Sequence, residues 1–198
     1  MASQGNKLID VPFIHDFYLE SFPSNKDRLI DFIESGEEDN TQDLSWTDLC
    51  SLEVQGITGD NPFNYLAPVL KEFIGDLGLD ILKINLRLTG IWRNTYRRGD
   101  FQEVHDHNYD DISGVIFLTD EQEDDGRFYF SNKSGNEIPF SWYKLREDNE
   151  RKIHQRRHYI KAERGKVILF PSYLQHGVTV HKSDNPRRTA AFNLQFLE

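Results

Sequence analysis

The stretch Gly165-Lys-Val-Ile-Leu-Phe-Pro171-Ser-Tyr-Leu-Gln175-His176 decides which fold the sequence favours. A glycine precedes an apolar run, a proline ends that run, and a histidine follows five residues after the proline. Short apolar runs between turn residues are typical of buried β-strands. The segment therefore predicts a strand with a histidine just beyond its end.

Other strand-like patterns fill the second part of the chain and are separated by turns rich in Gly, Asp and Asn. They cover residues 84–88, 91–96, 113–118, 127–130, 177–180 and 189–196. Many short strands with such turns favour an antiparallel barrel or jelly roll. Residues 141–165 interrupt the series and are predicted to be a long insertion, which we expect to shape the entrance to a site.

The first part of the chain has the apolar spacing of helices. Ser24-Asn25 offer an N-cap to an apolar cluster between residues 29 and 33. A second amphipathic helix is expected to begin near Pro62 and to end at Gly78. Helices followed by strands predict an α+β fold with the helices packed on one sheet. We expect one domain, 1–198, with a mainly helical part over 1–79 and a jelly-roll core over 80–198.

Composition excludes several classes of protein. The formal net charge of -10 argues against nucleic-acid binding, which needs clustered basic residues. No apolar run is long enough to predict a transmembrane span. One cysteine, Cys50, cannot form an intramolecular disulfide or a thiolate zinc site. A reducing, cytoplasmic location is the expectation.

Two histidines, His105 and His107, flank a single aspartate shortly before the strand at 113–118. On an extended segment both imidazoles point to the same side and can meet one ion. Imidazole suits Fe, Zn, Cu or Ni, so the pair alone does not name the metal. A jelly roll could bring His176 back as a third ligand, although a hydrogen-bonded loop histidine would look the same in sequence.

An arginine follows His176 by eleven residues, in Arg187-Arg-Thr189-Ala-Ala-Phe-Asn193. In a strand Arg187, Thr189, Ala191 and Asn193 share one face, and Ala190, Phe192 and Leu194 share the other. A guanidinium beside a hydroxyl is suited to binding a carboxylate. The alternative is a pair of surface arginines.

Taken together, these motifs resemble the 2-oxoglutarate and Fe(II)-dependent oxygenase superfamily, and most closely its bacterial and phage-type members. The matching motifs are Trp92-Arg-Asn94, His105-Asp-His107, Ser113-Gly-Val115, Phe170-Pro-Ser172, His176, Arg187-Arg-Thr189 and Phe192-Asn193. The likeness covers about residues 79–196. It implies a double-stranded β-helix, which is a cupin-like jelly roll.

The resemblance also implies roles for individual residues. His105, His107 and His176 would hold Fe(II) and would form the catalytic centre. Arg187 with Thr189 would bind the distal carboxylate of 2-oxoglutarate. Asn94 and Tyr96 would line the cosubstrate pocket, unless they serve only strand packing.

The reaction implied by the resemblance consumes O₂ and 2-oxoglutarate and releases succinate and CO₂. A small molecule or a protein side chain would be hydroxylated. The usual triad of the superfamily has two histidines and one carboxylate. Here His107 stands at the carboxylate position, so either the iron has three histidines, which we favour, or Asp110 or Asp111 substitutes.

Two other function classes fit parts of the sequence. A metal-binding cupin of another kind, such as a different dioxygenase, an isomerase or a binding protein, would share Gly165, Pro171 and His176. It would have no need for Arg187 and Thr189, and Asp111 stands where a cupin has glutamate. A jelly-roll binding module without enzymatic activity, in which the histidines are incidental, is the third interpretation.

Overall fold

The structure is a computed structural model that describes residues 17–39, 50–131 and 157–197. The helices are α1 (Lys26–Ser35), α2 (Phe63–Asp76) and the short 3-10 helix η3 (Ile81–Lys83). The strands are β1 (Leu19–Ser21), β2 (Glu37–Glu38), β3 (Cys50–Ser51), β4 (Glu53–Thr58), β5 (Asn85–Tyr96), β6 (Phe101–His105), β7 (Ile112–Phe117), β8 (Phe128–Ser131), β9 (Arg157–Ile160), β10 (Val167–Pro171), β11 (His176–Val178) and β12 (Arg187–Leu197).

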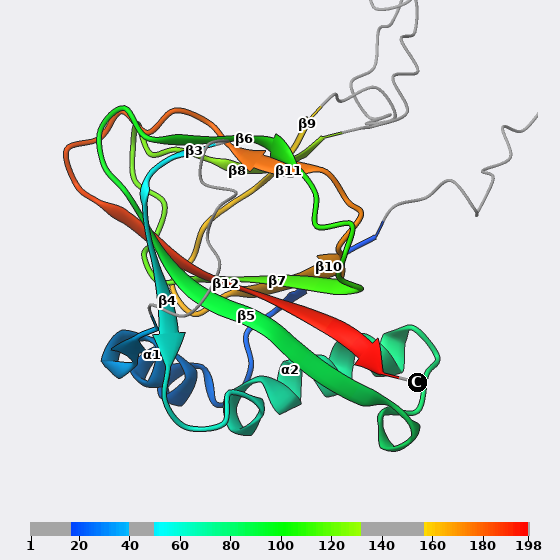
Figure 1. Ribbon diagram of the computed structural model, residues 1–198. Coiled ribbons are helices and arrows are strands. Elements are labelled where there is room, and N and C mark those ends of the chain that lie inside the picture. Colours follow the sequence, from blue (N-terminus) through cyan, green and yellow to red (C-terminus); the bar gives the residue numbers. More distant parts are fainter. Residues whose placement is uncertain (1–16, 40–49, 132–156, 198) are drawn as a thin grey trace, which may run out of the picture.

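Two antiparallel sheets face each other, and α1 and α2 lie on the outer side of the larger sheet (Figure 1). The larger sheet has the strand order β1-β10-β7-β12-β5-β4-β2, and the smaller sheet has the order β3-β6-β11-β8-β9. This is the α+β, double-stranded β-helix that the sequence predicts, with the helices packed on one sheet. The prediction of the fold class is confirmed.

Each strand-like segment of the sequence overlaps a strand, although 177–180 runs past the end of β11, and β5 joins two of the segments without a break. The sequence does not predict β6, whose side chains are half-buried or exposed and therefore show no apolar alternation. It also does not predict β1 to β4 in the first part of the chain, although β4 pairs with β5 and β1 with β10. Of the expected insertion at 141–165, residues up to 156 lie outside the described residues, and 157–160 form β9.

The two helices begin and end close to where the sequence predicts. Asn25 precedes α1, but its side chain does not cap the helix; instead its amide donates a hydrogen bond of 2.8 Å to the carbonyl of Tyr65. Gly78 follows α2 with a φ of 72°, a conformation that glycine adopts without strain. The Asn25 contact thus joins the start of α1 to α2.

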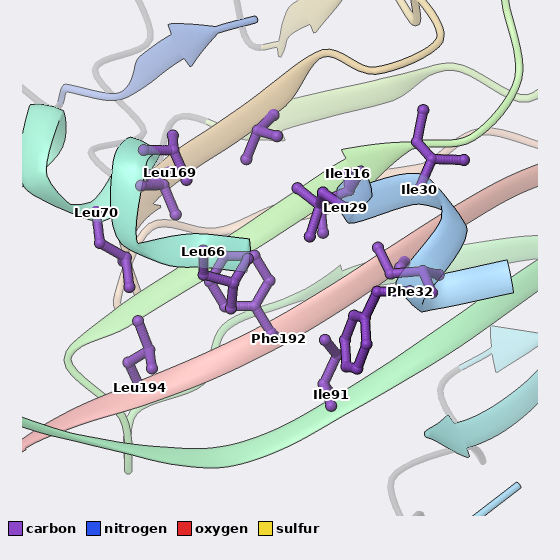
Figure 2. Close-up of a cluster of buried hydrophobic side chains, with 14 of the residues drawn as sticks. Leu29, Ile30, Phe32, Leu66, Leu70, Ile91, Ile116, Leu169, Phe192 and Leu194 are labelled. Atoms are coloured by element: carbon purple, nitrogen blue, oxygen red, sulfur yellow. The ribbon is translucent and has the colours of Figure 1, made fainter. Parts of the chain in front are cut away.

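A first hydrophobic core lies between the helices and the larger sheet. Figure 2 shows Leu29 and Phe32 of α1 and Leu66 of α2 meeting strand side chains such as Phe192. The strands contribute alternate residues: β12 provides Ala190, Phe192 and Leu194, all of them buried. The intervening residues of β12 therefore face the space between the two sheets, where the second core lies.

A β-bulge in β5 determines which of its residues reach that inner space. Asn193 pairs with Gly90 and Leu194 pairs with Leu88, so Thr89 is an extra residue without a partner in the ladder. Leu88 and Ile91 consequently pack on the same helix-facing core. Trp92, Asn94 and Tyr96 are then left to face inward.

Gly114 in β7 lies beneath the ring of Phe192. A methyl group at this position would come within 2.2 Å of Phe192 Cζ, which is closer than real contacts allow. We expect Gly114→Ala to lower the free energy of unfolding by about 1–3 kcal/mol, because overpacking forces core side chains out of place. Chemical denaturation measures this loss.

Gly75 in α2 provides a matched control for that substitution. No atom lies within 4 Å of a methyl group built there. Gly75→Ala should raise the free energy of unfolding by about 0.5–1 kcal/mol, as expected for glycine in a helix interior. Equal stability of the Gly114→Ala protein and the parent would contradict the packing described here.

Candidate metal centre and cosubstrate site

Three histidines meet on the inner side of the smaller sheet. His105 ends β6 and His176 begins β11, and the two residues are direct partners in the ladder between these strands. His107 follows two residues after the end of β6. The ring centroids lie 4.3 Å apart for His105 and His176, and 5.1 Å and 5.3 Å from these to His107.

Hydrogen bonds orient two of the three imidazoles. His105 Nδ1 lies 2.8 Å from the carbonyl of Glu103, and His176 Nδ1 lies 2.9 Å from the carbonyl of Leu174. A carbonyl only accepts, so Nδ1 carries the proton in each ring and Nε2 keeps its lone pair. One ring nitrogen from each of the three histidines lies within 4.8 Å of the others.

Burial keeps these imidazoles neutral. Loss of water lowers the pKa of His105, lowers the pKa of His107 to about 4, and lowers that of the fully buried His176 well below its ordinary value. His105 also lowers the pKa of His107 and of His176, and His107 lowers that of His176. Neutral imidazole is the form that ligates metals, so the cluster has the correct charge state near neutral pH.

Aromatic rings surround the cluster. The rings of Phe128 and Phe170 lie 5.6 Å and 4.9 Å from that of His176, and the ring of Trp92 lies 6.3 Å from that of His107. These side chains exclude water from the inner side of the imidazoles. Exclusion of water lowers the local dielectric constant, and this strengthens electrostatic interactions at the centre.

The two aspartates considered as substitute ligands have other partners. Asp110 Oδ1 accepts a hydrogen bond of 2.7 Å from Thr89 Oγ1, and Asp111 Oδ2 accepts one of 2.8 Å from the backbone N–H of Phe196. Among the described residues, the group that could hold a metal consists of the three histidines. The structure therefore brings together the predicted histidines and leaves both carboxylates outside the cluster.

Arg187 begins β12 and is buried in the space between the sheets. Its guanidinium carbon lies 4.8 Å from the ring centroid of Tyr96 and 5.8 Å from that of Phe117. Nε, Nη1 and Nη2 have no hydrogen-bond partner within the described part of the chain. Burial lowers the pKa of Arg187, but a guanidinium stays protonated in proteins because its ordinary pKa is so high.

The other predicted cosubstrate residues lie beside Arg187. Thr189 is the next inward residue of β12, and its hydroxyl oxygen accepts a hydrogen bond of 3.4 Å from the amide of Asn94. Asn94 Oδ1 is buried and has no partner among the described residues. Tyr96 offers its ring face to the guanidinium, while its hydroxyl donates to Gln102 Oε1 over 3.2 Å. The structure therefore places all four residues together.

A continuous row of rings links Arg187 to the histidines. Phe117 lies under the guanidinium, Phe128 contacts Phe117 at a centroid distance of 6.4 Å, and Phe128 in turn contacts His176. Both groups thus face the same inner space. Three neutral imidazoles fit a divalent transition metal, and a buried guanidinium with no anionic partner among the described residues fits a carboxylate.

Comparison with known families agrees with this chemistry. The family model described as "Putative 2OG-Fe(II) oxygenase" matches residues 90–193, which contain the three histidines and Arg187. The chain belongs to this oxygenase family. Fe(II) and 2-oxoglutarate are accordingly its metal and its cosubstrate, and the oxygenase is an oxidoreductase.

Solved structures of other oxygenases share the fold at low sequence identity. A prolyl-4-hydroxylase from Pseudomonas putida has a TM-score of 0.58 and 13% identity, with 92% of this chain and 94% of that chain covered. HygX from Streptomyces hygroscopicus, solved with nickel, 2-oxoglutarate and hygromycin B, has a TM-score of 0.58 and 14% identity over 93% of this chain and 84% of that one. At such identities the likeness shows the fold alone.

Two further findings complete the comparison. A search of curated proteins finds no match to this oxygenase. Among the helices of the described residues, none has both the length and the apolar character that a membrane crossing requires.

A large hollow on the described surface of the oxygenase lies away from this site. It has a volume of about 980 Å³, and its lining includes Tyr129, Arg157 and Thr179 but neither the three histidines nor Arg187. Tyr129 lies between the inward-facing Phe128 and Phe130 in β8, so it points to the outer side of the smaller sheet. This hollow is therefore separate from the candidate metal centre.

The sequence analysis missed several residues that shape the site of the oxygenase. Phe128 and Phe170 enclose His176, and Trp92 borders His107. Trp92 belongs to the Trp92-Arg-Asn94 motif that resembles the oxygenase superfamily, and this motif could have indicated its role. The two phenylalanines look like ordinary strand residues in sequence, and only the pairing of β8 and β11 brings Phe128 to the histidine.

Proposed function

We propose that this oxygenase hydroxylates a small molecule or a protein side chain at a centre held by His105, His107 and His176. Arg187, with Thr189, binds the distal carboxylate of 2-oxoglutarate. The observation that carries the proposal is a buried guanidinium that has no carboxylate partner among the described residues and faces the same inner space as the three imidazoles. A charge buried without a partner is costly, so the site calls for a bound anion.

When bound, Fe(II) together with 2-oxoglutarate supplies the oxidising chemistry, with succinate and CO₂ as products. His105, His107 and His176 would hold this metal through three imidazole nitrogens. Arg187 and Thr189 orient the cosubstrate through charge-assisted hydrogen bonds. Phe117, Phe128 and Phe170 keep water away from the inner space.

The competing function classes account for fewer of these features. A cupin of another kind needs the histidines but gives no reason for a buried guanidinium beside Asn94 and Thr189. A binding module without a metal gives no reason for three imidazoles that each bring a ring nitrogen within 4.8 Å of the others. The proposed function explains both groups of residues.

Hydroxylation is the finer part of the proposal. The similar structures include prolyl hydroxylases but also SnoN, an epimerase, and SnoK, a carbocyclase, so the fold alone does not determine the outcome. HygX was solved with hygromycin B, which supports a small-molecule substrate as one option.

A cytoplasmic location stays a prediction based on the single cysteine.

An anaerobic titration tests the proposal. Purified protein is loaded with Fe(II), and 2-oxoglutarate is added while visible absorption is recorded. We expect a metal-to-ligand charge-transfer band that saturates at one equivalent of cosubstrate per protein. Fe(II) binding without such a band would favour the cupin, and absence of Fe(II) binding would favour the binding module. Release of succinate then serves to screen candidate substrates.

A further inference from the structure

Three buried polar side chains meet beside the metal centre: Ser113, Ser172 and Asn193. Ser113 Oγ lies 2.8 Å from Ser172 Oγ and 2.8 Å from Asn193 Oδ1. They are 2%, 0% and 7% exposed, respectively. They come from β7, from the residue after β10 and from β12, which are neighbouring strands of the larger sheet. Each belongs to a separate motif to which the proposed function gives no role.

The hydrogen bonds of this serine–asparagine network run in one direction. Asn193 Oδ1 can only accept, so Ser113 donates its single hydroxyl proton to Asn193. Ser113 must then accept from the hydroxyl of Ser172. Every hydroxyl proton is therefore used, and a buried polar network whose members are satisfied gives a rigid, unique arrangement.

The backbone of Ser172 holds the segment that carries His107. The Ser172 carbonyl accepts a hydrogen bond of 2.9 Å from the N–H of His107, and the Ser172 N–H donates one of 3.1 Å to the carbonyl of Asp111. Ser172 thus contacts both ends of the stretch between β6 and β7. The side-chain network in turn fixes Ser172 to Ser113 and Asn193.

His107 is the ligand that depends most on such support. His105 and His176 lie in paired strands, and each ring has a hydrogen bond to a carbonyl. His107 lies beyond the end of β6, and its ring makes no hydrogen bond within the described part of the protein. The position of its imidazole therefore depends on its backbone, which Ser172 holds.

We propose that Ser113, Ser172 and Asn193 are positioning residues that hold His107 in place and so set the metal affinity of the centre. The proposal rests on the proposed function, because it takes His107 as a metal ligand. The network acts through the backbone of Ser172 and touches neither metal nor substrate.

Titration with Co(II), read by its visible absorption and by competition with a chelator, tests this role. We expect Ser113→Ala and Ser172→Ala each to weaken Co(II) binding by about 10-fold, as is typical when a group supporting a metal ligand is lost. The visible spectrum of bound Co(II) should also change, because the third imidazole is less well fixed. Ser113→Thr keeps the hydroxyl and should restore affinity close to that of the parent.

Ser21 provides a matched control. Its hydroxyl is also buried and donates a hydrogen bond of 2.7 Å, but to Glu72 of α2 on the helix side of the sheet. Ser21→Ala should leave both Co(II) affinity and spectrum unchanged. An equal loss of affinity in Ser21→Ala would overturn the proposal, since general destabilisation would then explain the effect.

A double-mutant cycle with His107→Ala distinguishes an effect of the network on the position of His107 from a general loss of stability. If the network acts through His107, adding Ser172→Ala to His107→Ala should cause no further loss of Co(II) affinity. A further 10-fold loss in that background, or unchanged affinity in both serine variants, would overturn the positioning role alone. A parent protein that does not bind Co(II) would overturn the proposed function together with it.

Discussion

His176→Ala is expected to remove metal binding and, with it, the 2-oxoglutarate-dependent absorption band. In the proposed centre His176 would be the central ligand, because it is buried, pairs with His105 across the ladder and contacts two phenylalanine rings. Loss of a supporting group already weakens metal binding by about 10- to 100-fold, so loss of a ligand should weaken it by more than about 100-fold. Equilibrium dialysis against Fe(II) under anaerobic conditions measures this.

His181 provides the control for that experiment. It is completely buried, but its Nδ1 accepts from the N–H of Gly126 and its Nε2 donates to the carbonyl of Asn185, so both ring nitrogens are used by the backbone. His181→Gln should lower stability while one Fe(II) still binds. Retention of Fe(II) by His176→Ala, or its loss from His181→Gln, would contradict the assignment of the centre.

Arg187→Met should have two opposite effects. The affinity for 2-oxoglutarate should fall by at least about 30-fold, because truncating one partner of a buried charge pair costs about 2–5 kcal/mol. Without cosubstrate, the free energy of unfolding should rise by about 1–3 kcal/mol, since an apolar side chain replaces an unpaired buried charge. Fe(II) affinity should not change.

Arg188 provides a control that tests whether the effects of Arg187→Met are specific to position 187. Arg188 points to the helix side, where it forms an ion pair of 2.6 Å with Glu34, and both side chains are about one-third exposed. Arg188→Met should lower stability by no more than about 1 kcal/mol and should leave 2-oxoglutarate affinity unchanged. Charge-transfer titrations and denaturation of both variants would reveal the difference, and similar results for the two would contradict the site.

Much of the larger sheet could be predicted, because its strands have the helices on one side and the space between the sheets on the other. In β12 the alternation of apolar and polar residues correctly predicts that Arg187 and Thr189 share a face opposite to Phe192. The spacing of His105 and His107 likewise predicts two imidazoles on one side. These features depend only on local geometry, in which side chains two residues apart point the same way.

Features that depend on strand register could not be predicted. Ser113 meets Asn193 because the two are direct partners between β7 and β12, and His176 meets His105 through a ladder that contains the unpredicted strand β6. A shift of one residue would separate each pair, and nothing in the local sequence fixes it. The bulge at Thr89 could not be predicted either, because the apolar residues on its two sides look like two separate strands in the sequence.

The alternation of β12 also separates the evolutionary constraints on the oxygenase. Substitutions at Ala190, Phe192 or Leu194 act on the helix-facing core and therefore on how much folded protein a cell keeps. On the proposed function, substitutions at Arg187, Thr189 or Asn193 would act on the chemistry, with the helix-facing packing left intact. One strand therefore presents selection with two sets of positions on opposite faces, one that packs against the helices and one that faces the proposed site.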